Sequence, residues 1–147
     1  MKLNLGCGTK QISGYLNIDN EPTTKPDMVL DLTKTPYPWK NNSIEKIRLD
    51  NTIEHLHVNP LRLILELKRI LKPNGKLFII APNCFYWKSR LKFLFGRFEA
   101  NQGYHFEHCW FLKPSFLKKL LDYYGFETSQ VNDLFDQEIR ITARKRA

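Results

Sequence analysis

The chain has 147 residues, of which 42% are hydrophobic, so we expect one domain, residues 1–147, with its own core. No apolar run approaches the ~20 residues that a membrane span needs. The first residues predict a strand, so we expect neither a span nor a signal peptide. The 3 cysteines are scattered without a Cys-x-x-Cys pair. This argues against a disulfide framework or a Cys-rich zinc site and favours a cytoplasmic location.

The formal net charge is +8, which suggests an anionic partner. Charge alone does not identify that partner, because many basic domains bind nothing specific. Nucleic acid is therefore kept open as a partner without being favoured.

The first two predicted strands both end in residues suited to ligand binding. Residues 3–8, Leu-Asn-Leu-Gly-Cys-Gly, form a short apolar strand that stops on Gly6 and Gly8. Residues 14–19, Gly-Tyr-Leu-Asn-Ile-Asp, form a second one that stops on Asp19. A glycine turn lets a ligand touch the backbone, and a carboxylate at the tip of the next strand accepts hydrogen bonds from a ribose diol. Together they predict a site for a nucleoside-containing cofactor.

Spacing indicates which cofactor this is. A dinucleotide fingerprint needs a third glycine, where Gln11 stands, and an acid roughly 20 residues further on, well after Asp19. S-adenosylmethionine has no pyrophosphate, and needs only the close backbone approach and the acid. At these residues the chain resembles the class I S-adenosylmethionine-dependent methyltransferases, in particular their small branch that is similar to methyltransferase type 11.

A polar connection with two prolines at residues 20–26 is too short for a packed helix, and residues 27–31 predict a third strand. The resemblance implies that Asp31 binds the adenine amino group and that the Leu32 amide meets a ring nitrogen. The alternative is that Asp31 caps a turn or a helix. The resemblance also implies a helix before the first strand. Because Met1 stands almost directly against that strand, we expect a more open methionine end of the site.

Residues 44–50 predict a fourth strand, and Asn51 follows at its carboxyl end, where ligands bind in open α/β sheets. The run Ile-Glu-His-Leu at residues 53–56 is a second match to the family, which carries a Glu-His pair here. His55 is therefore a candidate base. The alternative is that Glu54 and His55 satisfy backbone groups at a turn.

Residues 60–71 predict a helix that is pressed against the sheet. Asn59 suits the N-cap, a proline follows it, and leucine and isoleucine recur on one face. Lys-Pro-Asn-Gly at residues 72–75 predicts a turn. Residues 76–82 predict a central strand covered on both faces, because the apolar run is continuous. Glu-Leu-Lys-Arg-Ile-Leu-Lys-Pro-Asn-Gly-Lys-Leu, residues 66–77, is the third and most specific match to the family.

Residues 83–112 depart from the alternation of strands and helices. Trp87, Leu91, Leu94 and Phe95 have helical spacing, with basic residues on the other side. This predicts a helix that caps a core or a site. An anionic lipid surface or a second subunit are the alternative partners of such a helix.

His105 and His108 lie in an aromatic stretch of the same segment, followed by Cys109. A metal site needs three or four ligands, and the sequence holds no second cluster, so we expect no metal. The resemblance implies that this segment lies over the methyl group and shapes the acceptor pocket. His105 or His108 then join His55 as candidate catalytic bases for an acceptor hydroxyl.

An amphipathic helix is predicted at residues 114–124, between a proline and Gly125. Residues 126–134 and 138–143 predict two further strands. The resemblance covers nearly the whole chain and implies the α/β class. The expected fold is a three-layer Rossmann-like sandwich with a mostly parallel seven-stranded sheet and an antiparallel C-terminal hairpin.

The resemblance implies an enzyme that uses S-adenosylmethionine and releases S-adenosylhomocysteine. The cofactor-binding residues that it implies follow the tips of the first four strands: Leu5, Gly6, Cys7, Gly8, Asp19, Asn20, Asp31, Leu32 and Asn51.

The acceptor is the least determined part of this interpretation. An Asn-Pro-Pro-Tyr-type motif for methylating nucleobase amines is absent, since Ala-Pro-Asn-Cys stands at residues 81–84. This favours a small-molecule or glycan acceptor. An RNA-directed methyltransferase is the alternative, because Lys and Arg are interleaved with aromatics at residues 86–98. A cofactor-binding protein without catalysis is a third hypothesis, and a homodimer is also open.

Overall fold

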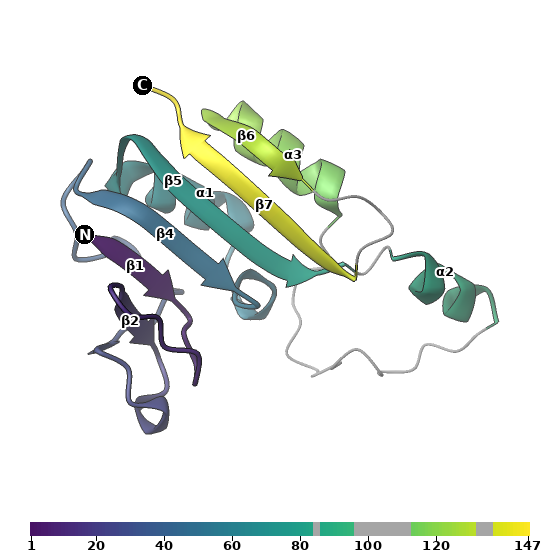
Figure 1. The fold of residues 1–147 in the computed structure, drawn as a ribbon, viewed down its shortest axis with the longest axis horizontal. Coiled ribbons are helices and arrows are strands. Elements are labelled where there is room, and N and C mark those ends of the chain that lie inside the picture. Colours follow the sequence, from purple (N-terminus) through teal and green to yellow (C-terminus); the bar gives the residue numbers. More distant parts are fainter. Residues whose placement is uncertain (84–85, 96–112, 132–136) are drawn as a thin grey trace.

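The computed structural model describes residues 1–83, 86–95, 113–131 and 137–147, which form one seven-stranded sheet with helices beside it (Figure 1). The strands are β1 (Lys2–Leu5), β2 (Leu16–Asp19), β3 (Met28–Val29), β4 (Ile44–Asp50), β5 (Leu71–Pro82), β6 (Phe126–Val131) and β7 (Glu138–Lys145). The α-helices are α1 (Pro60–Ile70), α2 (Trp87–Leu94) and α3 (Pro114–Tyr123), and two 3-10 helices are η1 (Pro22–Thr24) and η2 (Ile53–His55). No described helix is both long enough and apolar enough to cross a membrane.

The strand order is β3-β2-β1-β4-β5-β7-β6. The first five strands pair in parallel, and β7 runs antiparallel to both β5 and β6. This confirms the α/β class, the mostly parallel seven-stranded sheet and the antiparallel C-terminal hairpin. The strand order reverses between β1 and β4. That is the topological switch point, where open α/β sheets bind their ligands beyond the carboxyl ends of the strands.

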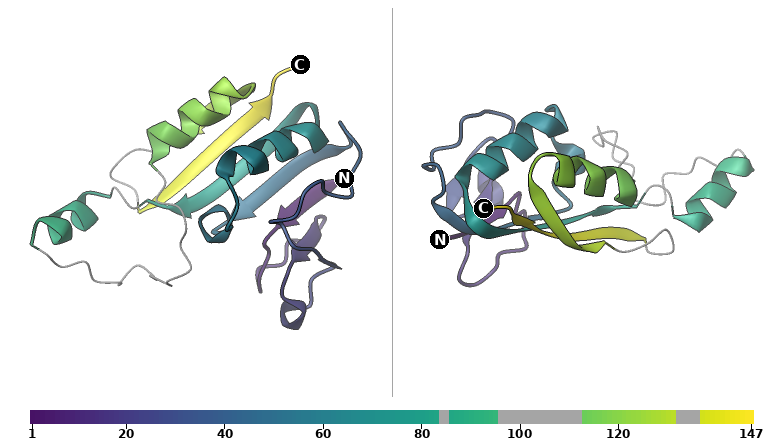
Figure 2. Two further views of the ribbon diagram at one scale, coloured as in Figure 1. Left: turned by 180° about the vertical axis from the view of Figure 1, so that it is seen from behind. Right: turned by 90° about the horizontal axis from the view of Figure 1, so that it is seen from above.

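The core lies on one face of the sheet. The strand register aligns Leu3, Ile47, Leu77 and Ala143 across β1, β4, β5 and β7, and all four are buried. Helices α1 and α3 both lie on this side of the sheet (Figure 2). The apolar residues that they bury are Leu63, Ile64, Leu67 and Ile70 from α1 and Leu117 and Leu121 from α3.

The face of β5 that points away from α1 and α3 is less buried than the sequence predicts. Leu77, Ile79 and Ala81 are buried, whereas Phe78 and Ile80 between them are partly exposed. Coverage on both faces is therefore wrong for this strand in the described part of the chain. The reason is that β1, β2 and β3 are joined by short connections without an α-helix, so the described residues form the sheet and one helical layer.

Helix α1 begins as its cap signals predict, since Asn59 Oδ1 accepts a 2.9 Å hydrogen bond from the Leu61 N–H. The predicted turn after it is incorporated into β5 as a bulge. Ile44 pairs with Leu71, but the next pair is Lys46 with Lys76, so the intervening residues of β5 have no partners in this ladder. A φ of 63° at Asn74 accommodates the bulge.

Strand β3 is shorter than the predicted residues 27–31. The side chain of Asp27 accepts a 2.7 Å hydrogen bond from the Asn17 N–H, so this residue serves β2 instead of continuing β3. The N–H of Leu30 still donates to the Asp19 carbonyl over 2.9 Å. That bond keeps the chain alongside β2 and brings Asp31 to the same edge of the sheet as Asp19.

Candidate functional site

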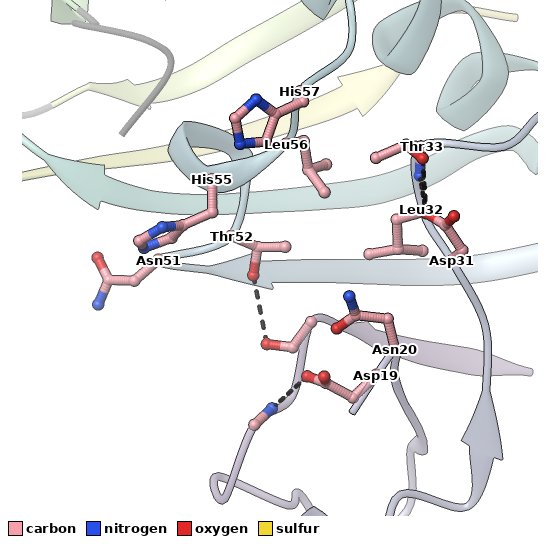
Figure 3. Close-up of a pocket in the computed structure, with 12 residues that line it drawn as sticks. Asp19, Asn20, Asp31, Leu32, Thr33, Asn51, Thr52, His55, Leu56 and His57 are labelled. Atoms are coloured by element: carbon pink, nitrogen blue, oxygen red, sulfur yellow. Dashed lines mark hydrogen bonds between the residues drawn. The ribbon is translucent and has the colours of Figure 1, made fainter. Parts of the chain in front are cut away.

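A pocket of about 350 Å³ opens at the carboxyl edge of the sheet, where the loops after β1, β2, β3 and β4 meet (Figure 3). This volume is in the range of small-molecule and cofactor sites. The lining residues are Gly6, Gly8, Asp19, Asn20, Asp31, Leu32, Thr33, Asn51, Thr52, His55, Leu56 and His57. Seven of the nine predicted cofactor residues are therefore brought together here; Leu5 and Cys7 are buried beside the pocket and do not line it.

Gly6 and Gly8, in the turn after β1, are required for two different reasons. Gly6 has a φ of +67°, and a Cβ atom there would lie 2.2 Å from Cγ2 of Thr52, well inside contact distance. Gly8 also has a positive φ, +49°, but a Cβ there would meet no atom within 4 Å. Gly6 is thus required for packing, whereas Gly8 leaves open space into which a ligand could approach the backbone.

Asp19 is a buried carboxylate at the tip of β2. Its Oδ2 atom accepts a 2.7 Å hydrogen bond from the Gly8 N–H, and its Oδ1 atom accepts a 3.0 Å bond from the Glu21 N–H. Figure 3 shows the carboxylate facing the glycine turn. Each carboxylate oxygen can accept more than one hydrogen bond. Asp19 therefore holds the turn in place and keeps acceptor capacity for a ligand hydroxyl.

A buried amide pair supports the connection between β1 and β2. Asn4 Nδ2 donates to Asn17 Oδ1 over 2.9 Å, and the same oxygen accepts a 2.8 Å bond from the Ile12 N–H. Asn17 Nδ2 in turn donates to Asp27 Oδ2 over 2.9 Å. These bonds satisfy the polar groups of a connection that has no helix, and they fix the loop that carries Gly8.

Asp31 makes the contacts of a turn cap. Its Oδ1 atom accepts bonds from the N–H and the hydroxyl of Thr33 at 2.9 and 2.6 Å, and Lys34 lies 3.2 Å from Oδ2. These bonds, above all the one from the Thr33 hydroxyl, hold the pKa of the carboxyl below its usual value. The turn-cap interpretation of Asp31 is therefore supported by direct contacts, and the residue also lines the pocket.

The opposite wall of the pocket comes from the chain after β4. The Asn51 N–H donates to the Ile80 carbonyl over 2.9 Å, and Asn51 has a φ of +49°, which turns the chain away from the sheet. The Thr52 hydroxyl donates to the Leu5 carbonyl over 3.1 Å and so ties this wall to β1. His55 and His57 follow, and Figure 3 shows them on the side of the pocket away from Asp31.

Glu54 does not share the pocket with the residues that follow it, His55 and Leu56. It is 2% exposed, it does not line the pocket, and neither carboxylate oxygen has a hydrogen-bond partner among the described residues. Burial raises the pKa of this carboxyl to about 7, with a smaller contribution from the charge of Asp50. A carboxyl group in this position is protonated over a wider pH range than an exposed one.

Some lining residues were not predicted from the sequence. Thr33, Thr52 and His57 follow predicted residues in the chain, but nothing in their own pattern marks them. Leu56 belongs to the Ile-Glu-His-Leu match, but no role was predicted for it. Two predicted bases, His105 and His108, lie outside the described residues. Among the residues that the structure describes, no three His, Cys, Asp or Glu side chains are grouped as metal ligands. Burial raises the pKa of the Cys7 thiol, which is typical of a packed cysteine.

Comparisons with known proteins agree with this arrangement. The sequence matches the family described as a methyltransferase domain over residues 17–131. The fold is similar to that of a SAM-dependent methyltransferase, a possible histamine N-methyltransferase, from Thermotoga maritima. That match has 15% identity and a TM-score of 0.73, and covers 99% of this chain and 82% of the other. An S-adenosylmethionine-dependent methyltransferase from Mesorhizobium loti matches with 14% identity, a TM-score of 0.71, and 98% and 90% coverage.

The methyltransferase CalH, whose structure is a complex with SAH, matches with 16% identity and a TM-score of 0.66, over 98% of this chain and 51% of that chain. The search of curated proteins gave no match. The pocket fits a nucleoside-containing cofactor, because Gly8 leaves room at the backbone and Asp19 retains acceptor capacity. With the family match over most of the sequence, the chain belongs to the methyltransferase-domain family and is an S-adenosylmethionine-dependent methyltransferase of class I.

Proposed function

We propose that the chain transfers a methyl group to a hydroxyl of a small molecule or a glycan. The observation that carries the proposal is that His55 lines the same pocket as the cofactor residues, on the side away from Asp31. A neutral imidazole can accept the proton that an acceptor hydroxyl loses. His55 is half-buried, so it combines contact with the pocket and access to a second molecule.

The residues that would hold the cofactor line the wall formed by the ends of β1, β2 and β3. Gly8 would let it approach the backbone, Asp19 and Asn20 would meet the ribose, and Asp31 with Leu32 would meet the base. When bound, S-adenosylmethionine supplies an activated methyl group on a sulfonium. The protein then contributes mainly alignment of donor and acceptor, which can lower the barrier by several kcal/mol without covalent catalysis.

The end of β5 supports a hydroxyl acceptor over a nucleobase amine. Asn83, in the Ala-Pro-Asn-Cys run of residues 81–84, directly follows the last residue of β5. It is 1% exposed, and its N–H donates to the Gln137 carbonyl over 2.9 Å. A side chain so deeply buried is poorly placed to contact the amine of a nucleobase that enters from solution. His105 and His108 remain candidate bases of the proposal, at positions outside the described residues.

The experiment is a screen of acceptor classes with cofactor labelled at the methyl group: sugars, glycan fragments, phenols, amines and RNA. We expect label in a hydroxyl compound. With that acceptor, His55→Ala and His55→Gln should lower kcat by about 100-fold or more and leave the Kd for S-adenosylhomocysteine nearly unchanged. His57→Ala, which alters an exposed histidine of the same pocket, is the matched control.

Two results would contradict the proposal in different ways. Label found only in amines or in RNA would reject the hydroxyl acceptor. Full turnover in both His55 variants would reject His55 as the base and direct the same measurement to His105→Ala and His108→Ala.

A further inference from the structure

Four basic residues form a row across the sheet on the face away from the helices. Lys2 pairs with Lys46, Lys46 with Lys76, and Lys76 with Arg144, on the adjacent strands β1, β4, β5 and β7. Directly opposite residues of neighbouring strands point to the same face. The row therefore places four cations side by side, with a strand spacing of about 4.8 Å between their backbones. We call the surface around this row the open face.

The row is unfavourable for folding by itself. Like charges directly opposite each other destabilise a sheet. Within the described ranges, no carboxylate lies within ion-pair distance of Lys2, Lys46 or Lys76. Only Arg144 is neutralised, by Glu127 at 2.6 Å. Three lysines in register, without a carboxylate partner among the described residues, are suited to an anionic ligand that would relieve their repulsion.

Aromatic rings accompany the lysines. Lys46 Nζ lies 4.4 Å from the ring centre of Phe78, which is partly exposed on the same face. Lys2 and Lys46 both lie 5.8 Å from the ring centre of Tyr15. Arg48 stands next to Phe78 across the strands and pairs with Asp50 at 3.0 Å. Cations interleaved with aromatic rings are the usual components of surfaces that bind single-stranded nucleic acid.

No described helix covers this face. Helices α1 and α3 lie together on the other side of the sheet (Figure 2), where the aligned core residues are buried. The connection between β1 and β2 covers only the β1–β2 end, where Asn4 and Asn17 are buried. In the described part of the chain, Lys2, Lys76 and Arg144 of this row are exposed and Lys46 is half-buried.

We propose that the open face is a binding surface for single-stranded RNA. Phosphates contact Lys2, Lys46 and Lys76, and Phe78 with Tyr15 supplies rings against which bases or riboses pack. Some RNA-binding domains stack bases on aromatic side chains of an exposed sheet face. The open face offers the same combination of an exposed sheet and aromatic rings. The proposal goes beyond the methylation of a small molecule or glycan and does not depend on which acceptor is methylated.

Other occupants fit the face less well. A second copy of the chain would bring one basic row against another. A lipid surface needs protruding apolar side chains, but most of the large apolar residues that the structure exposes belong to the helices, among them Leu65, Leu94 and Phe116. An acidic protein or polysaccharide would satisfy the lysines without using the rings of Phe78 and Tyr15.

The test is direct binding of a fluorescent single-stranded oligouridylate to the full chain at several salt concentrations. We expect the Kd of Lys46→Ala/Lys76→Ala to rise about tenfold. The slope of log K against log salt should become less negative by about 1.4, because roughly 0.7 is lost per phosphate contact. Phe78→Leu alone should also weaken RNA binding relative to the parent. The slope should remain unchanged, since this variant removes a ring and no charge.

The matched control is Arg62→Ala/Lys119→Ala, which removes the same charge from exposed positions on α1 and α3. It should leave RNA binding within twofold of the parent. The melting temperature adds an independent readout: Lys46→Ala/Lys76→Ala should melt at the same or a higher temperature, because two repelling charges are gone.

The proposal is overturned if the parent chain does not bind the oligonucleotide, or if the control variant loses as much affinity as the open-face variant. It is also overturned if heparin or anionic phosphatidylserine vesicles bind as tightly as RNA, or if Phe78→Leu binds RNA like the parent. None of these readouts uses methyl transfer, so they are separate from the outcome of the acceptor screen.

Discussion

The N–H of Gly8 donates a 2.7 Å hydrogen bond to Oδ2 of Asp19, so the carboxylate proposed to meet the ribose also holds the glycine turn. Its other oxygen accepts from the Glu21 N–H. Cofactor binding and local stability are therefore coupled at Asp19. A substitution there changes both, by different amounts.

Asp19→Ala should weaken the binding of S-adenosylhomocysteine by about 1.5–3 kcal/mol, the usual range for hydrogen bonds to a charged group. It should also lower the free energy of unfolding by about 1–3 kcal/mol, because the Gly8 and Glu21 N–H groups lose their partner. Titration calorimetry and thermal unfolding measure the two effects. Asp19→Asn keeps one acceptor oxygen, so both of its losses should lie between those of the parent and of Asp19→Ala. Unchanged affinity in a folded Asp19→Ala protein would count against the assigned role.

The two glycines of the turn should respond differently to alanine. Gly6→Ala brings a methyl group to 2.2 Å from Thr52 Cγ2 at a positive φ, so we expect a loss of about 3 kcal/mol or more in unfolding free energy. Gly8→Ala meets no atom and should cost only about 1–2 kcal/mol for the left-handed backbone. Its main effect should be on cofactor affinity. Chemical denaturation of both variants checks this; equal losses of stability would contradict it.

Ligand-induced stabilisation should separate the cofactors. At about 100 times its Kd, S-adenosylmethionine or S-adenosylhomocysteine should stabilise the native state by about 2.7 kcal/mol. For a chain of this length that corresponds to a rise in melting temperature of about 5–10 °C. NAD should produce no shift, because the site has neither the third glycine nor the later acid of a dinucleotide fingerprint. A shift with NAD alone would be incompatible with the assigned pocket.

Glu54 should make the protein less stable as the pH rises. Its pKa is raised to about 7 in the folded protein, against about 4.3 in an unfolded chain. Between these values the folded state holds a proton that the unfolded state releases, so the free energy of unfolding falls as the pH increases and levels off above about 7. Glu54→Gln should remove this dependence and gain on the order of 2–3 kcal/mol over the parent at pH 8. Parallel pH profiles of the two proteins would contradict the assignment.

Glu66 should show the opposite dependence. Its carboxylate accepts 2.6 and 2.9 Å bonds from Arg69 and a 2.7 Å bond from the Tyr37 N–H, and these bonds, those of Arg69 first, hold its pKa below the usual value. Its contribution is therefore present above the unfolded pKa of about 4.3 and lost as the pH falls through the folded pKa. Glu66→Gln should cost about 1–3 kcal/mol at pH 7, with the difference from the parent shrinking below about pH 4. Urea denaturation at several pH values measures it.

The parts of this molecule that could be predicted from the sequence depend on local chemistry. The cap formed by Asn59 and the start of α1 follow from the residues at the helix end, since a side-chain acceptor and a proline act within one turn. Gly6, Gly8 and Asp19 could be grouped because the ends of adjacent parallel strands meet at one edge. The family resemblance then supplied Asp31, which the structure brings to the pocket while its Oδ1 atom accepts the bonds of Thr33.

Long-range relationships were decided only by the tertiary structure. The contact between Gly6 and Thr52 and the burial of Glu54 depend on how Thr52 meets the end of β1 and how η2 packs against β5. No pattern within residues 51–56 encodes these contacts. The apolar run of β5 predicted two covered faces, but coverage depends on what the remaining chain can supply. Sequence alone determined the presence of the lysines. Their alignment in one row was decided by strand register, because pairing across β1, β4 and β5 turns residues far apart in the chain into direct neighbours.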